Sequence, residues 1–177
     1  MRYKERDPEA RMAYLRTLRH RIQQQGSADI IYLDESGFPA TTQREYGWAP
    51  KGRQVHGERS GNTRPRTSLI AGKRGTELLA PFLFAGSTDA LWFNQWLREH
   101  LFKTLRPQST LILDNAAFHK KTAIHAMAEQ AGHQALFLPP YSPDFNAIEH
   151  DFAVIKKQWA NAPPNTPLDD IIKSYGT

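Results

Sequence analysis

The N-terminal end of the chain carries an apolar pattern with helical spacing. Leu15, Leu18 and Ile22 recur at intervals of three and four residues, and the pattern ends at Gly26. An Asp-Pro pair at residues 7–8 precedes them, with the aspartate as a capping residue and the proline suited to the first helical turn. We therefore predict an amphipathic, basic helix over this segment.

Short runs of β-branched and aromatic residues follow and predict strands. The first run, residues 30–33, stops at Asp34, where the sequence Asp-Glu-Ser-Gly is typical of a turn. A Gly- and Arg-rich stretch at residues 51–66 is expected to form a loop between later strands. The further strands are expected near residues 46–48 and 67–71, with a fourth candidate at 78–84.

Strand-like and helix-like patterns alternate in the second half of the chain. The expected elements are a helix that begins after residues 87–89 and ends at Arg106-Pro107, a strand at 110–113, a helix at about 120–131, a strand at 134–138 and a last long helix. Apolar stripes assign two pairs of residues to the core: Trp96 and Leu101 of the helix that ends at Arg106-Pro107, and Ile148 and Phe152 of the last helix. This order predicts an α/β fold, with one mixed sheet and helices packed on its faces.

The composition fits one globular domain. With 177 residues, of which 40% are hydrophobic and 23% charged, the chain is long enough to bury about 70% of its unfolded surface. No stretch approaches the ~18 unbroken apolar residues of a membrane span, and no apolar signal-peptide core follows the N-terminus, so we expect a cytoplasmic protein without a membrane partner. The absence of cysteine excludes disulfides, thiolate zinc sites and cysteine nucleophiles.

The formal net charge of +5 is distributed unevenly. Residues 1–25 hold seven Arg and Lys against three acids, and residues 51–74 hold seven against one, so the remaining residues sum to −5. Clustered basic residues are typical of proteins that bind nucleic acid, because they release counterions from its phosphates. Charge alone leaves open the alternative that both blocks are solvated faces.

Three acidic residues lie where a buried structure does not require them. Asp34 and Asp114 each follow a predicted strand, and Glu149 lies on the last helix, one position off its apolar stripe. Each has an ordinary explanation, as a turn former, a helix cap or a solvated helix residue. If the two strands are neighbours, the three acids form a cluster that repels itself unless a cation neutralises it. Oxygen ligands favour Mg²⁺ or Mn²⁺, and two such ions about 4 Å apart can drive in-line attack at phosphorus.

Three motifs resemble those of a known family. They read Tyr-Leu-Asp34-Glu-Ser-Gly-Phe, Leu-Ile-Leu-Asp114-Asn115-Ala-Ala-Phe-His119-Lys and Leu-Pro-Pro-Tyr-Ser-Pro-Asp-Phe-Asn146-Ala-Ile-Glu149-His. They resemble the catalytic motifs of D-D-E transposases, most closely those of the bacterial insertion-sequence branch of the mariner superfamily. The 34 residues between Asp114 and Glu149 are the interval characteristic of the D-D-E members of that superfamily.

The resemblance implies a ribonuclease-H-like fold, in which a mixed sheet carries helices on both faces. It implies that Asp34, Asp114 and Glu149 are catalytic and ligate two Mg²⁺ ions, for which Mn²⁺ can substitute. It further implies cleavage at the ends of a mobile element and attack of the freed 3′-hydroxyl on target DNA, by a homo-oligomer assembled on DNA. A catalytically inactive DNA-binding remnant and a nuclease or resolvase of the same fold are the alternatives.

Supporting and DNA-binding residues are expected around these motifs. Asn115 and His119 would orient a carboxylate or contact a phosphate, although helix capping explains them equally well. Asn146 precedes Glu149 by three residues and would hold its carboxylate or cap the helix. The basic residues expected to follow DNA phosphates are Arg53, Arg59, Arg64, Arg66, Lys73, Arg74, Lys120, Lys121, Lys156 and Lys157.

The chain departs from the family in two places. Ala147 stands where family members commonly carry Pro, a change that relaxes the start of the helix without removing a ligand. Full-length relatives also carry an N-terminal helix-turn-helix region, which the basic helix of residues 1–26 is too short to replace. We therefore expect residues 1–26 to lead into a catalytic domain at 27–177. A separately encoded helix-turn-helix region, or truncation, would account for the difference.

Overall fold

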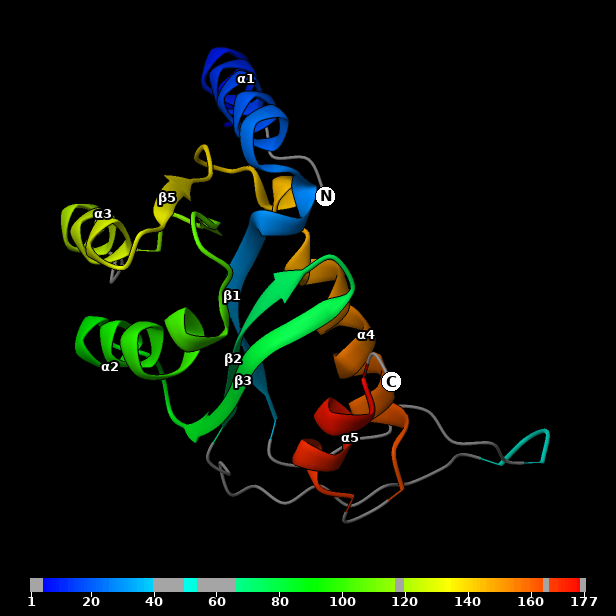
Figure 1. The fold of residues 1–177 in the computed structure, drawn as a ribbon. Helices are drawn as coiled ribbons and strands as arrows, with labels where there is room; N and C mark the ends of the chain where they lie inside the picture. Colours follow the sequence, from blue (N-terminus) through cyan, green and yellow to red (C-terminus); the bar gives the residue numbers. More distant parts are fainter. Residues whose placement is uncertain (1–4, 40–49, 54–65, 117–119, 164–165, 176–177) are drawn as a thin grey trace.

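A five-stranded mixed sheet forms the centre of the protein (Figure 1). The structure, a computed structural model, describes residues 5–39, 50–53, 66–116, 120–163 and 166–175. The strands are β1 (Ile30–Phe38), β2 (Thr67–Arg74), β3 (Glu77–Ala85), β4 (Thr110–Leu113) and β5 (Gln134–Phe137), in the order β3-β2-β1-β4-β5. β1, β2 and β3 are antiparallel neighbours, whereas β4 and β5 run parallel to β1. The predicted mixed α/β sheet is confirmed.

Helices cover both faces of this sheet, as expected. Figure 1 shows α2 and α3 on one side, α4 and α5 on the other, and α1 at one end. The helices are α1 (Pro8–Gln25), α2 (Ala90–Trp96), α3 (Lys121–Gln130), α4 (Ile148–Asn161) and α5 (Leu168–Ser174), with short 3-10 turns at Ser27–Asp29 and Pro143–Phe145. α2 continues through a π-helical turn (Leu97–Leu101) and a 3-10 turn (Phe102–Thr104). None of the described helices is both long and apolar enough to cross a membrane.

Alternating side chains of β1 divide between two hydrophobic cores. Ile31 and Leu33 pack with Trp96 on the face covered by α2 and α3. Phe38 points to the opposite face and packs with Ile148 of α4. Because consecutive strand residues point to opposite faces, a strand buried on both sides needs the continuous apolar run that residues 30–33 provide. The core stripes predicted for the two helices are confirmed.

α1 begins as predicted but turns a different face to the protein. The carboxylate of Asp7 caps the helix by accepting hydrogen bonds from two backbone N–H groups of the first turn, at 2.8 and 3.2 Å. The predicted apolar stripe is wrong in part, because Leu15 and Ile22 are 41% and 38% exposed. Tyr14 is buried instead, and Leu18 packs beside it against the end of the sheet.

β1 is longer than the sequence indicated. Residues 34–38 do not turn but pair with residues 67–71 of β2, so Asp34 lies inside the strand. The segment stays extended because pairing with β2 gives its backbone groups hydrogen-bond partners. The strand expected at 78–84 is confirmed as β3, whereas the one near 46–48 lies outside the described residues. α5 was not predicted.

β3 is an edge strand with an irregular backbone. Its pairing with β2 shifts register between Ile70 and Gly72 of that strand, and Ala80 has a φ of +46°. Pro81 follows directly, and proline has no backbone N–H to donate. The ladder at this edge is therefore interrupted within the strand.

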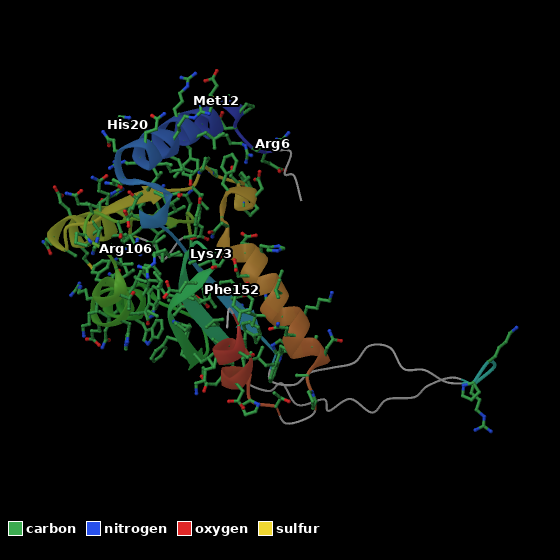
Figure 2. The ribbon with its side chains drawn as sticks, turned by 45° about the vertical axis from the view of Figure 1, so that its right-hand side comes forward. Arg6, Met12, His20, Lys73, Arg106 and Phe152 are labelled. Carbon is green, nitrogen blue, oxygen red and sulfur yellow. The ribbon has the colours of Figure 1, made fainter. Side chains whose placement is uncertain are left out.

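A buried ion pair ties the sheet to α4. Lys73 of β2 binds Asp151 of α4, and the Tyr175 hydroxyl donates a hydrogen bond to the same carboxylate at 2.5 Å. In Figure 2, Lys73 and the neighbouring α4 residue Phe152 lie at the contact between the sheet and this helix. Only 6% of the Asp151 side chain is exposed, so its charge depends on these partners.

We predict that Lys73→Ala lowers the free energy of unfolding by about 3–5 kcal/mol, because it leaves the Asp151 carboxylate buried without its ion-pair partner. The double variant Lys73→Met with Asp151→Leu should recover most of the loss, since apolar side chains can replace a buried ion pair. Urea unfolding measures both effects. The control is Lys173→Ala, which breaks an exposed pair with Asp169 and should leave the midpoint nearly unchanged. Equal stability of Lys73→Ala and wild type would contradict this assignment.

Candidate active site

The sheet brings two of the predicted catalytic carboxylates together. β1 and β4 are parallel neighbours, and Tyr32 pairs with Ile112. Asp34 and Asp114 each lie two residues further along, so they stand opposite each other. Their side chains point to the same face as those of Tyr32 and Ile112, which belong to the cores under α1 and α4.

Glu149 reaches this face of the sheet from α4. It is the second residue of the helix, and its neighbours Ile148 and Phe152 are buried against the sheet. The charges of Asp114 and Glu149 both raise the pKa of Asp34, and the charge of Asp114 raises the pKa of Glu149. Three side chains from β1, β4 and α4 therefore share one electrostatic environment.

Burial is the largest cause of the pKa shifts in this site. It raises the pKa of Asp34 to about 7, with the neighbouring acids adding to the shift and the Glu35 N–H, which donates to Asp34 at 2.7 Å, opposing it. Partial desolvation is also the largest cause at Glu149, which is otherwise exposed; neighbouring acids raise its pKa further and Lys156 lowers it. Desolvation and like charge both disfavour ionised carboxylates, so the site favours a proton or a cation.

The ordinary explanations of the two aspartates do not hold. Asp34 lies inside β1 rather than in a turn. Asp114 does not cap α3, because that helix begins only at Lys121; its Oδ1 instead accepts a hydrogen bond from the Ala116 N–H at 3.1 Å. Glu149 is exposed, as a solvated helix residue would be, but its pKa responds to Asp114.

The donor set fits a hard divalent cation. Three carboxylates offer oxygen ligands of the kind that Mg²⁺ and Mn²⁺ prefer. Among the described residues, no group of three or more acidic, histidine or cysteine side chains could hold a metal ion by itself. Mg²⁺ commonly binds one or two carboxylates and takes its other ligands from water and substrate phosphates. The residues present therefore suit an ion whose coordination the substrate completes.

Asn146 fixes the start of α4 to β1. Its side-chain N–H donates to the Leu33 carbonyl at 3.4 Å, and its backbone carbonyl accepts a hydrogen bond from the Glu149 N–H at 3.2 Å. Of the two roles expected from the sequence, the helix cap is not found, because no side chain caps α4 by a hydrogen bond. The hold on the Glu149 carboxylate stays a prediction. The Asn146 side-chain oxygen is buried and has no hydrogen-bond partner within the described part of the chain.

Asn115 supports the loop after β4. Its side-chain N–H donates to the backbone carbonyl of Leu138, which follows β5. This hydrogen bond joins the segments that leave two neighbouring strands, and so holds the chain next to Asp114. His119 lies outside the described residues.

Two of the predicted DNA-binding residues are engaged elsewhere. Lys73 forms the buried pair with Asp151, and Arg74 pairs with Glu77 at 2.8 Å. Their side chains are only 16% and 18% exposed. The Lys73 charge is compensated by a buried acid, so its interpretation as a phosphate ligand is corrected. The Glu77 side chain is 59% exposed, so the interpretation of Arg74 as a phosphate ligand stays a prediction.

The other predicted DNA-binding residues differ in their surroundings. Arg66 lies over the backbone of β1 at Gly37, in the space that a Cβ would need. Lys121 and Lys156 place their ammonium groups 5.1 and 5.9 Å from the centres of aromatic rings on β5 and β1. Arg53, Lys120 and Lys157 are exposed. Arg59 and Arg64 lie outside the described residues.

Sequence reasoning missed the contact that docks α1 beside this site. Arg11 donates two hydrogen bonds to Asp144, at 2.9 and 2.7 Å, and its guanidinium lies 3.8 Å from the centre of the Phe145 ring. Asp144 belongs to the third motif, but Arg11 is 133 residues away. No local pattern pairs them, and the one available signal was the basic charge of the first helix.

The fold matches solved transposase structures. The mariner Mos1 paired end complex with Mg matches with a TM-score of 0.76 at 15% identity, over 100% of this chain and 57% of that chain. The corresponding complex with Mn gives 0.75 at 22% identity, over 98% and 54%. The catalytic domain of Mos1 mariner transposase gives 0.68 at 16% identity, over 98% and 85%. These likenesses establish the ribonuclease-H-like fold, and the chain spans about half the length of the transposase chains in the paired end complexes.

Family membership rests on the sequence itself. No curated protein matches the chain. A family model described as DDE superfamily endonuclease matches residues 29–171, a range that contains Asp34, Asp114 and Glu149 and most of the chain. With the three acids of its motifs on one face of a ribonuclease-H-like sheet, the chain belongs to the DDE superfamily endonuclease family.

Proposed function

We propose that the chain is a transposase catalytic domain that cuts DNA and joins the freed 3′ end to a target in a divalent-metal-dependent reaction. The observation that carries the proposal is the convergence of Asp34, Asp114 and Glu149 from β1, β4 and α4. Membership of the DDE superfamily endonuclease family supports DNA cleavage. The fold likeness to Mos1 in a strand transfer complex supports the joining step.

The three carboxylates would hold the metal ions, and two Mg²⁺ or Mn²⁺ ions are proposed. Ions bound there would activate a water or a 3′-hydroxyl and stabilise the leaving oxygen of an in-line displacement at phosphorus. The Glu35 N–H orients the Asp34 carboxylate, and Asn146 ties the helix that carries Glu149 to β1. Burial of Asp34 strengthens its attraction to a cation, because charges interact more strongly in a medium of low dielectric.

DNA is the proposed partner, through its backbone phosphates. Lys120 and Lys157 are exposed at the start of α3 and on α4, and Lys156 lies close enough to Glu149 to lower its pKa. The Mos1 chains that share this fold occur in paired end complexes. By analogy we propose that this chain also forms a homo-oligomer on DNA.

Asp114→Asn should lower both cleavage and joining of DNA by at least about 100-fold, because loss of a residue that merely supports a metal ligand already costs up to that much. Gel analysis of a labelled duplex end mixed with a target plasmid measures both products. Mn²⁺ at about 100 times its Kd should stabilise the wild type by about 2.7 kcal/mol, or roughly 5–10 °C in Tm, and should not stabilise Asp114→Asn.

The control for this experiment is Lys173→Ala, which breaks an exposed ion pair on α5 and should keep wild-type activity. Cleavage without any joined product would favour the nuclease alternative. Wild-type cleavage by Asp114→Asn would sink the proposed function altogether.

The stability of the metal-free protein should fall as the pH rises from about 4 to about 7. The pKa of Asp34 is about 7 in the folded state and about 3.9 in an unfolded chain. The folded state therefore binds the Asp34 proton more tightly than the unfolded chain does. The resulting stabilisation of the folded state, at most about 4 kcal/mol, is lost as the pH rises from about 4 to about 7. Urea unfolding across this range measures the slope, which Asp34→Asn should flatten.

Saturating Mn²⁺ should oppose this fall in stability, because a bound cation favours the ionised carboxylate. An unchanged slope in Asp34→Asn would refute the assignment.

The exposed lysines should account for part of the salt dependence of DNA affinity. Each phosphate contact that is lost should reduce the slope of log K against log salt by about 0.9. We expect this reduction for Lys120→Ala and Lys157→Ala. The double variant Lys73→Met with Asp151→Leu should leave the slope unchanged, because in the wild type Asp151 already pairs with that ammonium group. Fluorescence anisotropy with a labelled duplex measures the slope, and a wild-type slope in both exposed-lysine variants would contradict the proposal.

A further inference from the structure

A two-pronged ion pair joins α1 to the turn before α4. Nη1 and Nη2 of Arg11 donate to Oδ1 and Oδ2 of Asp144 at 2.9 and 2.7 Å, the paired geometry in which arginine binds a carboxylate with directional specificity. The guanidinium also lies 3.8 Å from the centre of the Phe145 ring, and the Arg11 side chain is 15% exposed. Asp144 binds the edge of the Arg11 guanidinium and Phe145 lies against its face, so the group is fixed in place.

The same face of α1 contacts Phe145 a second time. Tyr14, one turn after Arg11, is buried and stacks on the Phe145 ring, with 5.5 Å between ring centres and 14° between the planes. Phe145 in turn packs against the small core that contains Ile30 of β1 and Ile112 of β4. α1 therefore packs against a turn that itself packs against β1 and β4, the two strands of the site.

This turn leads directly into the residues that place Glu149. A hydrogen bond from the Asn146 N–H to the Pro143 carbonyl, at 2.8 Å, closes the turn. A second bond, from the Glu149 N–H to the Asn146 carbonyl at 3.2 Å, begins α4. The Asn146 side chain holds the same point to the Leu33 carbonyl of β1. A shift of the turn therefore moves the residue on which Glu149 depends.

Arg11 also compensates an acid close to Glu149. The hydrogen bonds from the Arg11 guanidinium hold the pKa of Asp144 below its usual value. Without Arg11, the negative charge of Asp144 would remain on the turn that leads into α4, with the weaker attraction of Arg6 to offset it.

From these contacts we propose that α1 belongs to the catalytic apparatus, with Arg11 as a positioning residue that sets the location of Glu149 through Asp144 and Phe145. The inference rests on the proposed role of Glu149 as a metal ligand. It gives the basic N-terminal helix a function other than phosphate binding. Displacement of α1 would weaken metal binding without any residue of α1 touching the metal.

Hydrogen exchange of the metal-free protein gives the first test. Arg11→Ala should speed exchange of the Asn146 and Glu149 amides by about tenfold or more, while amides in the middle of β1 keep their protection. Arg11→Lys keeps the charge and loses the paired geometry, so it should show a smaller effect, and it serves as the test variant if Arg11→Ala does not fold. Lys173→Ala is the matched ion-pair control. Wild-type exchange at both amides would overturn the inference.

The Mn²⁺ dependence of DNA cleavage by the full chain gives the second test. Arg11→Ala should raise the half-saturating Mn²⁺ concentration by about fivefold or more, with a smaller change in the maximal rate, because it loosens a ligand and does not remove one. In the background of Asp144→Asn, the same substitution should change this concentration by less than about twofold, since the two residues act as a unit. An equal loss with and without Asp144 would show that Arg11 does not act through Asp144, which overturns the inference.

Glu149→Gln separates failure of this inference from failure of the proposed function. If Glu149→Gln keeps wild-type cleavage, the proposed function fails. The inference then fails as well, because it rests on Glu149 as a metal ligand. If Glu149→Gln is inactive while Arg11→Ala matches the wild type in exchange and in Mn²⁺ dependence, the proposed function stands and the role of α1 is refuted.

Discussion

The parallel pairing of β1 with β4 forces like charges together. The register that pairs Tyr32 with Ile112 leaves Asp34 and Asp114 opposite each other, and α4 adds a third carboxylate on the same face. This arrangement is unfavourable without a cation, so the surrounding structure has to offset it. β4 is buried along its whole length, and apolar cores lie on both faces of β1. The carboxylates therefore stand on well-buried strands, which suits a site that needs fixed geometry.

Polar contacts complete the placement of α4. Its apolar stripe determines which side of the helix meets the sheet, but a smooth hydrophobic contact tolerates a slide along the helix axis. Directional contacts remove that freedom: Asn146 bonds to β1 before the helix begins, and Asp151 pairs with Lys73 of β2 in its first turn. Glu149 lies between these two points. Polar groups of this kind cost desolvation energy, and their value here is in fixing a register.

Local patterns predicted the parts of the fold that depend on local sequence. The apolar run at 30–33 and the stripe of α4 are visible in the sequence because burial acts on every second, third or fourth residue. The positions of Asp34, Asp114 and Glu149 followed from their motifs, which lie at the ends of such patterns. The apolar patterns and the motifs together were enough to predict the sheet and the three acids at its centre.

Features that depend on a distant partner were not predictable in this way. Lys73 lies in a basic block, and nothing nearby indicates that its partner is 78 residues away. β1 extends past its turn-like sequence because β2 supplies a ladder. Leu15 and Tyr14 are adjacent on α1, and only tertiary packing decides that the aromatic residue is buried.

The interrupted edge of β3 bears on how copies of this chain can meet. An exposed strand edge can recruit a strand from another molecule and start aggregation. Pro81 leaves β3 without one backbone N–H, and the distortion at Ala80 breaks the regular ladder beside it. The strand at the other edge, β5, is only four residues long. Edge-to-edge fusion of sheets is disfavoured on both sides, so copies of this chain that meet would contact each other through side chains and not through a shared sheet.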